Sequence, residues 1–251
     1  MENSLEQGKP QRSRVALWGF ALAVAGAVAA LLAGYGTRLG WWPFAMGFTL
    51  LKWAAYGAVA AIALSLAGLF MARRRGRRGA AWAGIGLVIA LLVVLVPLNY
   101  LRLARAVPPI HDITTDTQNP PRFVAILPLR KNAPNSAEYG GAAVAAQQAK
   151  AYPHIAPALL DAPPAQAFQR ALNAAQEMGW AIVEENPLDG RIEATATTRW
   201  FGFKDDVVIR VTPARQGSRV DVRSVSRVGV SDLGTNARRI EAYLKKLKET
   251  H

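Results

Sequence analysis

The chain has 251 residues, of which 51% are apolar, carries a formal net charge of +13 and contains no cysteine. Its positive mean hydropathy of +0.12 favours a membrane protein, and the lack of cysteine excludes disulfides, thiolate metal ligands and a cysteine nucleophile. Residues 1–110 hold 12 Lys and Arg against 2 Glu, and residues 111–251 hold 18 against 15. Because most of the excess positive charge flanks apolar segments, it indicates membrane orientation and anionic headgroups and argues against a nucleic-acid partner.

Three long apolar stretches predict three transmembrane helices, at about residues 15–35, 46–71 and 80–101. Each is close to the roughly 20 residues that a helix needs to cross a bilayer. The first stretch is open to a second interpretation as a secretory signal peptide, but such a peptide has an apolar core of only about 7 to 15 residues. Lys52 is the only charge well inside the spans. It lies near one end of the second span, from which its side chain can reach the headgroups, and a functional intramembrane charge is the alternative.

Five arginines between the second and third stretches orient the predicted helices. They are Arg73, Arg74, Arg75, Arg77 and Arg78. Short loops with this much positive charge stay on the cytoplasmic side, and the paired Trp41 and Trp42 are typical of an interfacial anchor on the opposite side. Arg102 and Arg105 act weakly in the other direction. The pattern predicts a multi-pass protein of the cytoplasmic membrane, with a cytoplasmic amino terminus and a periplasmic or extracellular carboxy-terminal domain.

The predicted boundary between the membrane domain and the extracytoplasmic domain falls at residues 106 and 107. Residues 107–164 contain ten prolines, which disfavour regular helix across this lead-in as a whole. Apolar stretches within it, such as Phe123 to Leu129, indicate that it packs along the domain surface.

The remainder predicts an α+β domain in the order helix, four-stranded antiparallel meander, helix. Asp161 is the expected cap of the first helix, whose first turn holds Pro163 and Pro164 and which ends at Gly179. Strands with period-two alternation are expected at residues 180–184, 191–198, 206–212 and 219–227. The last helix is expected from Asp232 to about Lys248, with Leu233 on its apolar stripe and both helices on one sheet face.

The most distinctive segments of this domain are Asp205–Val211, Gly217–Ser224, Ser226–Gly229 and Ser231–Ile240. They resemble the bacterial domain-of-unknown-function family 1499, and Ile110–Asp116 and Pro120–Phe123 resemble it more loosely. The resemblance covers about residues 108–248. It implies the limits of the domain and an envelope setting, and it implies no reaction.

One cluster of side chains is a candidate binding surface. It comprises Arg223, Arg227, Ser231, Asp232 and Asn236. The last strand leads directly into the last helix, so that guanidinium groups and free helix N–H groups can converge on one anion or carboxylate. Three structural alternatives remain open: a solvated sheet face with ion pairs that also involve Arg210 and Asp221, an ordinary helix cap at Ser231 or Asp232, and an Arg227–Asp232 pair.

The sequence offers no catalytic, cofactor-binding or metal-binding residues. Asp205 and Asp206 are adjacent on a strand and therefore point to opposite faces, and His111, His154 and His251 have no ligand spacing around them. The expected function is a non-catalytic binding or interaction domain, presented in the cell envelope by a protein embedded in the lipid bilayer, with another envelope protein or a polar ligand as its partner. The alternatives are an enzyme acting on an envelope substrate and a small transporter subunit.

The predicted topology can be tested with reporters fused after His251. A reporter that works only outside the cytoplasm is expected to be active when it is fused at this position. Neutral residues in place of the five arginines should leave part of the molecules inverted, because the orientation signal is weakened. Activity of a cytoplasm-only reporter on the unaltered chain would contradict the topology.

Overall fold

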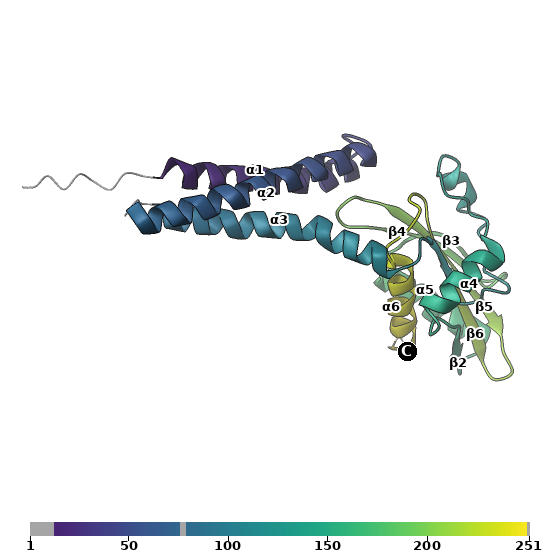
Figure 1. Ribbon diagram of the computed structural model, residues 1–251. Coiled ribbons are helices and arrows are strands. Elements are labelled where there is room, and N and C mark those ends of the chain that lie inside the picture. Colours follow the sequence, from purple (N-terminus) through teal and green to yellow (C-terminus); the bar gives the residue numbers. More distant parts are fainter. Residues whose placement is uncertain (1–12, 76–78, 250–251) are drawn as a thin grey trace, which may run out of the picture. The chain divides into compact units, whose positions relative to one another are not determined.

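The computed structural model describes residues 13–75 and 79–249 (Figure 1). Arg77, Arg78, His251 and the predicted amino-terminal tail lie outside the described residues. The chain forms two compact units that meet along the sequence at Leu101 and Arg102, with Trp200–Gly202 grouped with the first.

The first unit contains three long helices, α1 (Arg14–Arg38), α2 (Phe44–Arg75) and α3 (Ala80–Ala106). All three are long and apolar enough to cross a membrane, which confirms the three predicted apolar helices with somewhat wider bounds. α1 begins at a serine cap, because the amide of Ala16 donates to Oγ of Ser13 at 3.4 Å.

Small residues let these helices approach one another closely. A Cβ atom added to Gly19 of α1 would lie 2.9 Å from the backbone nitrogen of Ser65 in α2, and one added to Gly86 of α3 would lie 2.9 Å from Cα of Phe20. Van der Waals packing between small residues is a main source of helix association in lipid. The three helices therefore cross at a site where larger side chains do not fit.

The second unit contains the predicted antiparallel meander, formed by β3 (Ala181–Asn186), β4 (Arg191–Thr197), β5 (Lys204–Pro213) and β6 (Ser218–Ser226). The sheet has six strands and not the four expected, because β1 (Asp112–Thr114) and β2 (Ala158–Leu160) also pair with β6. Both extra strands lie in the proline-rich lead-in. At three residues each they are too short to show a period-two pattern.

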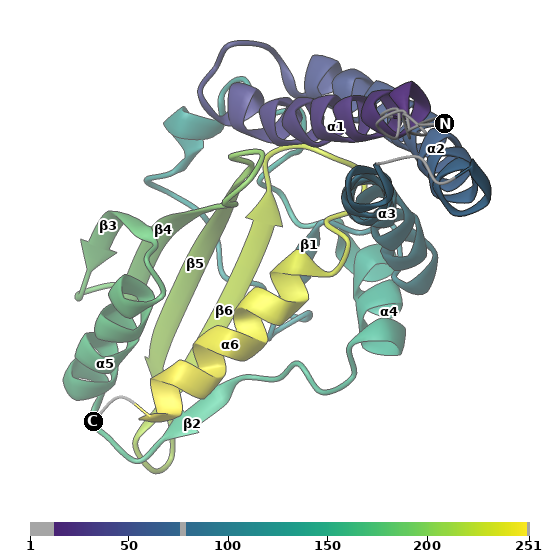
Figure 2. The same ribbon diagram turned by 90° about the vertical axis from the view of Figure 1, so that its left-hand side faces the viewer.

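The main hydrophobic core lies between one face of the sheet and two helices, α5 (Pro164–Glu177) and α6 (Thr235–Glu249) (Figure 2). Ile209 and Val222 of the sheet are fully buried, as are Ala171 of α5 and Ile240 of α6. The hydroxyl of Tyr243 donates to the carbonyl of Ala171 at 2.9 Å and joins the helices. This arrangement confirms that both helices cover the same face.

Two predicted helix starts are wrong. α5 has Pro163, and not Asp161, at its cap position, without a side-chain hydrogen bond; proline suits this end because the first helical residues need no N–H donor. α6 begins at Thr235 because Leu233 (φ 53°) and Gly234 (φ 74°) have left-handed backbone conformations that a right-handed helix excludes. Leu233 thus precedes the helix.

Part of the lead-in covers the opposite face of the sheet, where it forms the short 3-10 helix η1 (Leu127–Arg130). Phe123 and Ile126 pack there on Val208 and Val225 in a second small core. A regular helix that the prolines of the lead-in disfavoured, α4 (Gly141–Ala151), lies beside the edge strand β1, where Gln148 bonds to the amide and carbonyl of Thr114 at 3.0 and 2.6 Å. The predicted packing of the lead-in on the domain is confirmed. The alternative of a solvated sheet face with ion pairs is half right: Arg210 pairs with Asp221 across the strands at 3.0 Å, but Asp221 and Arg223 are buried and not solvated.

Candidate functional site

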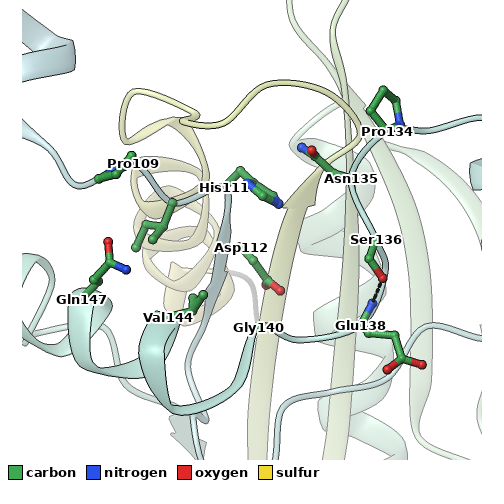
Figure 3. A pocket seen from close by; sticks show the side chains of 11 residues that line it. Pro109, His111, Asp112, Pro134, Asn135, Ser136, Glu138, Gly140, Val144 and Gln147 are labelled. Carbon is green, nitrogen blue, oxygen red and sulfur yellow. Dashed lines mark hydrogen bonds between the residues drawn. The ribbon is translucent and has the colours of Figure 1, made fainter.

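A cavity of about 370 Å³ lies between the residues that lead into β1, the segment 134–140 and α4 (Figure 3). Eleven residues line it, all of them in the lead-in. Two of its walls, before β1 and at 134–140, are mostly irregular backbone, whose geometry depends on what holds that backbone to the sheet.

The wall before β1 is held by the start of α6 and the loop that precedes it. Three hydrogen bonds do this: Oγ of Ser231 to the carbonyl of Pro108 at 3.5 Å, the amide of Asp232 to the carbonyl of Ile110 at 3.2 Å, and Nδ2 of Asn236 to the carbonyl of His111 at 2.9 Å. Three residues of the predicted binding surface thus position this wall of the cavity.

A fourth, Arg223, lies beneath the cavity and is 2% exposed. It donates to both carboxylate oxygens of Asp112, from Nε at 3.0 Å and from Nη2 at 2.7 Å, and also to the carbonyls of Pro121 and Ala137. Its guanidinium lies against the ring of Tyr139, 5.5 Å from the centroid. These hydrogen bonds join β1, Pro121 and Ala137 to Arg223 of β6.

Burial raises the pKa of two acidic groups near this guanidinium, those of Asp112 and Tyr139. Desolvation raises the pKa of Asp112, while the hydrogen bonds and charge of Arg223 act in the opposite direction. Burial and the nearby Asp112 carboxylate raise the pKa of Tyr139 to about 12, so that its phenol is neutral at physiological pH. The phenol oxygen is buried without a hydrogen-bond partner.

The fifth predicted residue, Arg227, is bound elsewhere. Its Nε and Nη2 donate to the two oxygens of Asp206 at 2.9 and 2.8 Å, and Arg130 from η1 donates to the same carboxylate at 2.6 Å. The alternative of an Arg227–Asp232 pair is wrong. Asp205 bonds to Arg239 of α6, which confirms that Asp205 and Asp206 point to opposite faces.

Asp232 occupies the amino end of α6, as the capping alternative expected. Its carboxylate accepts from the amides of Gly234 at 2.8 Å and Asn236 at 2.7 Å, although the helix itself begins only at Thr235. Burial raises the pKa of Asp232, and these two backbone hydrogen bonds oppose the shift. Binding of an anion by the five predicted residues stays a prediction, and each of them already has partners within the fold.

The polar groups of the cavity come from residues that the sequence did not single out. Nδ1 of His111 is 3.3 Å from the carbonyl of Val230, and Nδ2 of Asn135 donates to the carbonyls of Ser226 and Gly229. Figure 3 shows the His111 ring and the Asn135 amide directed toward each other, with the Glu138 carboxylate directed away. The looser resemblance at Ile110–Asp116 was the only sequence signal for this region.

The cavity lining carries no basic side chain, since its titratable members are His111, Asp112 and Glu138. Within residues 13–75 and 79–249, no group of three or more His, Cys, Asp or Glu side chains is placed to hold a metal ion. The lining therefore combines apolar residues, such as Ile110 and Val144, with a few hydrogen-bonding groups and contains no Lys or Arg.

Comparison with known families supplies the identity of this unit. A family described as "Protein of unknown function (DUF1499)" matches residues 112–247. The chain belongs to the DUF1499 family. The match confirms the resemblance, runs from the first residue of β1 into α6, and leaves the three long helices outside. A search among curated proteins found no match for the chain.

The Asp112–Arg223 pair gives a test of what holds the DUF1499 cavity together. Replacing Arg223→Met leaves a buried carboxylate without its partner, which typically costs about 3–5 kcal/mol of the free energy of unfolding. The double replacement Arg223→Met with Asp112→Leu should recover much of this loss, whereas Arg215→Ala, at an exposed turn position, should change it by less than about 0.5 kcal/mol. Chemical denaturation of the full chain in detergent measures all three.

The pH dependence of the Arg223→Met variant follows from the same acid. Without the guanidinium, the pKa of Asp112 in the folded state should rise further above its unfolded value, so the folded state binds the proton more tightly. Stability should then be greatest below the unfolded pKa and fall as the pH rises through the folded pKa. A double variant no more stable than Arg223→Met would contradict the role of the pair.

Proposed function

We propose that the DUF1499 domain is a binding domain, held on the extracytoplasmic side of the cytoplasmic membrane, and that the cavity beside His111 takes a small polar ligand. The observation that carries the proposal is a cavity with converging hydrogen-bonding groups whose walls are fixed before any ligand arrives. Prior fixing of a site reduces the entropy lost on binding and so favours affinity.

Hydrogen bonds hold the wall at His111 and the wall at Asn135. The carbonyl of His111 accepts from Asn236 and also from the amide of Ser226 at 3.0 Å. On the other side, the amide of Asn135 donates to the carbonyl of Arg227 at 3.1 Å. Both walls are therefore anchored to the same end of β6.

The charge of the lining favours a neutral or cationic ligand over an anion. The buried guanidinium groups next to the cavity are already bound within the fold. Four hydrogen bonds of Arg223 go to Asp112, Pro121 and Ala137. Arg130 donates to Asp206 and to the carbonyls of Asn135 and Ser136. The lining offers an anion no Lys or Arg side chain, and the Asp112 carboxylate is already paired with Arg223. Hydroxyl-rich or amine-bearing molecules fit this lining, because Asn135, Ser136 and Gln147 supply amide and hydroxyl groups.

One observation favours catalysis as the second candidate. In the tautomer in which Nδ1 of His111 donates to the Val230 carbonyl, Nε2 is the basic nitrogen, and the Asn135 amide is directed toward the ring (Figure 3). A neutral imidazole in a polar cavity is the commonest general base. An enzyme acting on an envelope substrate would use this nitrogen.

The proposal can be tested by photo-crosslinking in intact cells. A benzophenone amino acid at Gln147, an exposed residue of α4 that lines the cavity, should capture a ligand of defined mass, detected by mass spectrometry of the purified full chain. The same amino acid at exposed Arg215, which is not part of the lining, is the matched control. The adduct at position 147 should disappear when Ser136→Trp fills the cavity.

The outcome separates the candidates. If the adduct has the mass of an unaltered cellular molecule, the result supports a binding domain. If it has the mass of an altered molecule, and the alteration is lost in His111→Gln, the result supports the enzyme. The absence of any adduct specific to position 147 would contradict both uses of the cavity.

A further inference from the structure

Large apolar side chains are exposed together at one end of the sheet. Leu127 and Leu129 of η1 are 47% and 54% exposed, and Val230 in the loop after β6 is 77% exposed. The carbonyl of Leu129 accepts from Arg227 at 3.2 Å, and the amide of Arg227 donates to the carbonyl of Lys204 at 3.0 Å. These contacts bring η1, the loop after β6 and the β4–β5 hairpin to the same end of the sheet.

This end is also where the chain enters the domain. The carbonyl of Ile110 accepts from Asp232 in the loop after β6, and β1 begins at Asp112, six positions after the end of α3 at Ala106. Extended chain covers at most about 3.6 Å per residue, so these few residues keep the start of β1 within about 20 Å of the point where the apolar helix ends. If α3 crosses the membrane, this end of the sheet cannot lie far from the lipid surface.

The exposed charges at this end are basic. Lys131, Arg199 and Lys204 are exposed in the segments 127–132 and 198–204. Within the segments 127–132, 198–204 and 227–234, the only acid is Asp232, whose carboxylate accepts from two backbone amides at the start of α6. The hairpin sequence adds Trp200, a residue type enriched at membrane interfaces. Apolar side chains next to basic ones are the composition that binds a lipid surface.

We propose that this end of the DUF1499 domain binds the lipid bilayer, with Leu127, Leu129 and Val230 at the boundary of headgroups and acyl chains and Lys131 and Lys204 on anionic headgroups. The surface is separate from the cavity lining, which shares none of these five residues. The covalent link to apolar helices favours lipid over a protein partner as the occupant, because it keeps the local concentration of lipid high.

The test uses the cysteine-free full chain, which permits single labels. Leu129→Cys and, as the matched control, Leu188→Cys are labelled with a fluorophore and reconstituted into vesicles that carry a nitroxide on the lipid headgroup. Leu188 is 98% exposed in the turn between β3 and β4, at the opposite end of the sheet. Quenching at position 129 should exceed that at position 188, because a headgroup nitroxide quenches only fluorophores close to the lipid surface.

Two further arms make the result decisive. Val230→Cys should be quenched like Leu129→Cys, which guards against a local disturbance of η1. The double replacement Lys131→Glu with Lys204→Glu should reduce quenching in vesicles that contain phosphatidylglycerol more than in phosphatidylcholine alone. Equal, weak quenching at positions 129, 230 and 188 would overturn the proposal and would leave the exposed apolar residues to a protein partner.

Discussion

Buried ion pairs between the lead-in and the sheet determine the shape of the DUF1499 domain. Asp112 is bound by Arg223, and Arg130 is bound by Asp206, which Arg227 also contacts. Another buried carboxylate, that of Glu193, accepts from the amides of Val124, Ala125 and Ile126 at 2.8 to 3.1 Å. Buried charges cost much free energy unless they are paired, so each of these contacts strongly favours one path of the lead-in over others.

The cavity follows from these contacts. An irregular segment gains few backbone hydrogen bonds of its own, and the bonds that hold it come here from side chains of the sheet. Arg223 donates to the carbonyls of both Pro121 and Ala137 and so holds the two ends of the loop between them. The position of Asn135 is set in the same way by the carbonyls at the end of β6. The polar groups around the cavity are thereby held in place by Arg223 and by hydrogen bonds to the end of β6 and the start of α6.

The sequence predicted the regular parts of the fold and missed the irregular ones, for physical reasons. The alternation of Val207, Ile209 and Val211 identified β5, and the stripe that includes Phe168 and Leu172 identified α5, because both elements bury one face on the main core. β1 and β2 exist only through their pairing with β6, a contact that no local pattern encodes. The family resemblance gave the domain limits, and the family match extends only to the α+β unit.

The candidate site shows the same division. Arg223 and Asn236 were singled out as binding residues because guanidinium and amide groups near a helix start suit anions. Their partners, Asp112 and the carbonyl of His111, are more than 100 positions away in the sequence. Without the fold, a residue that positions a wall cannot be distinguished from one that binds a ligand. The exposed leucines of η1 likewise became informative only when the sheet placed them at the end where the chain enters.

Amide hydrogen exchange on the full chain in a membrane is the most direct measurement of the central claim, that sheet side chains hold the lead-in in one conformation. The account predicts that the amides of Val124, Ala125 and Ile126, bound by Glu193, exchange nearly as slowly as those of β5 and β6. Exchange of these three amides as fast as that of the exposed turn at Leu188 would contradict it.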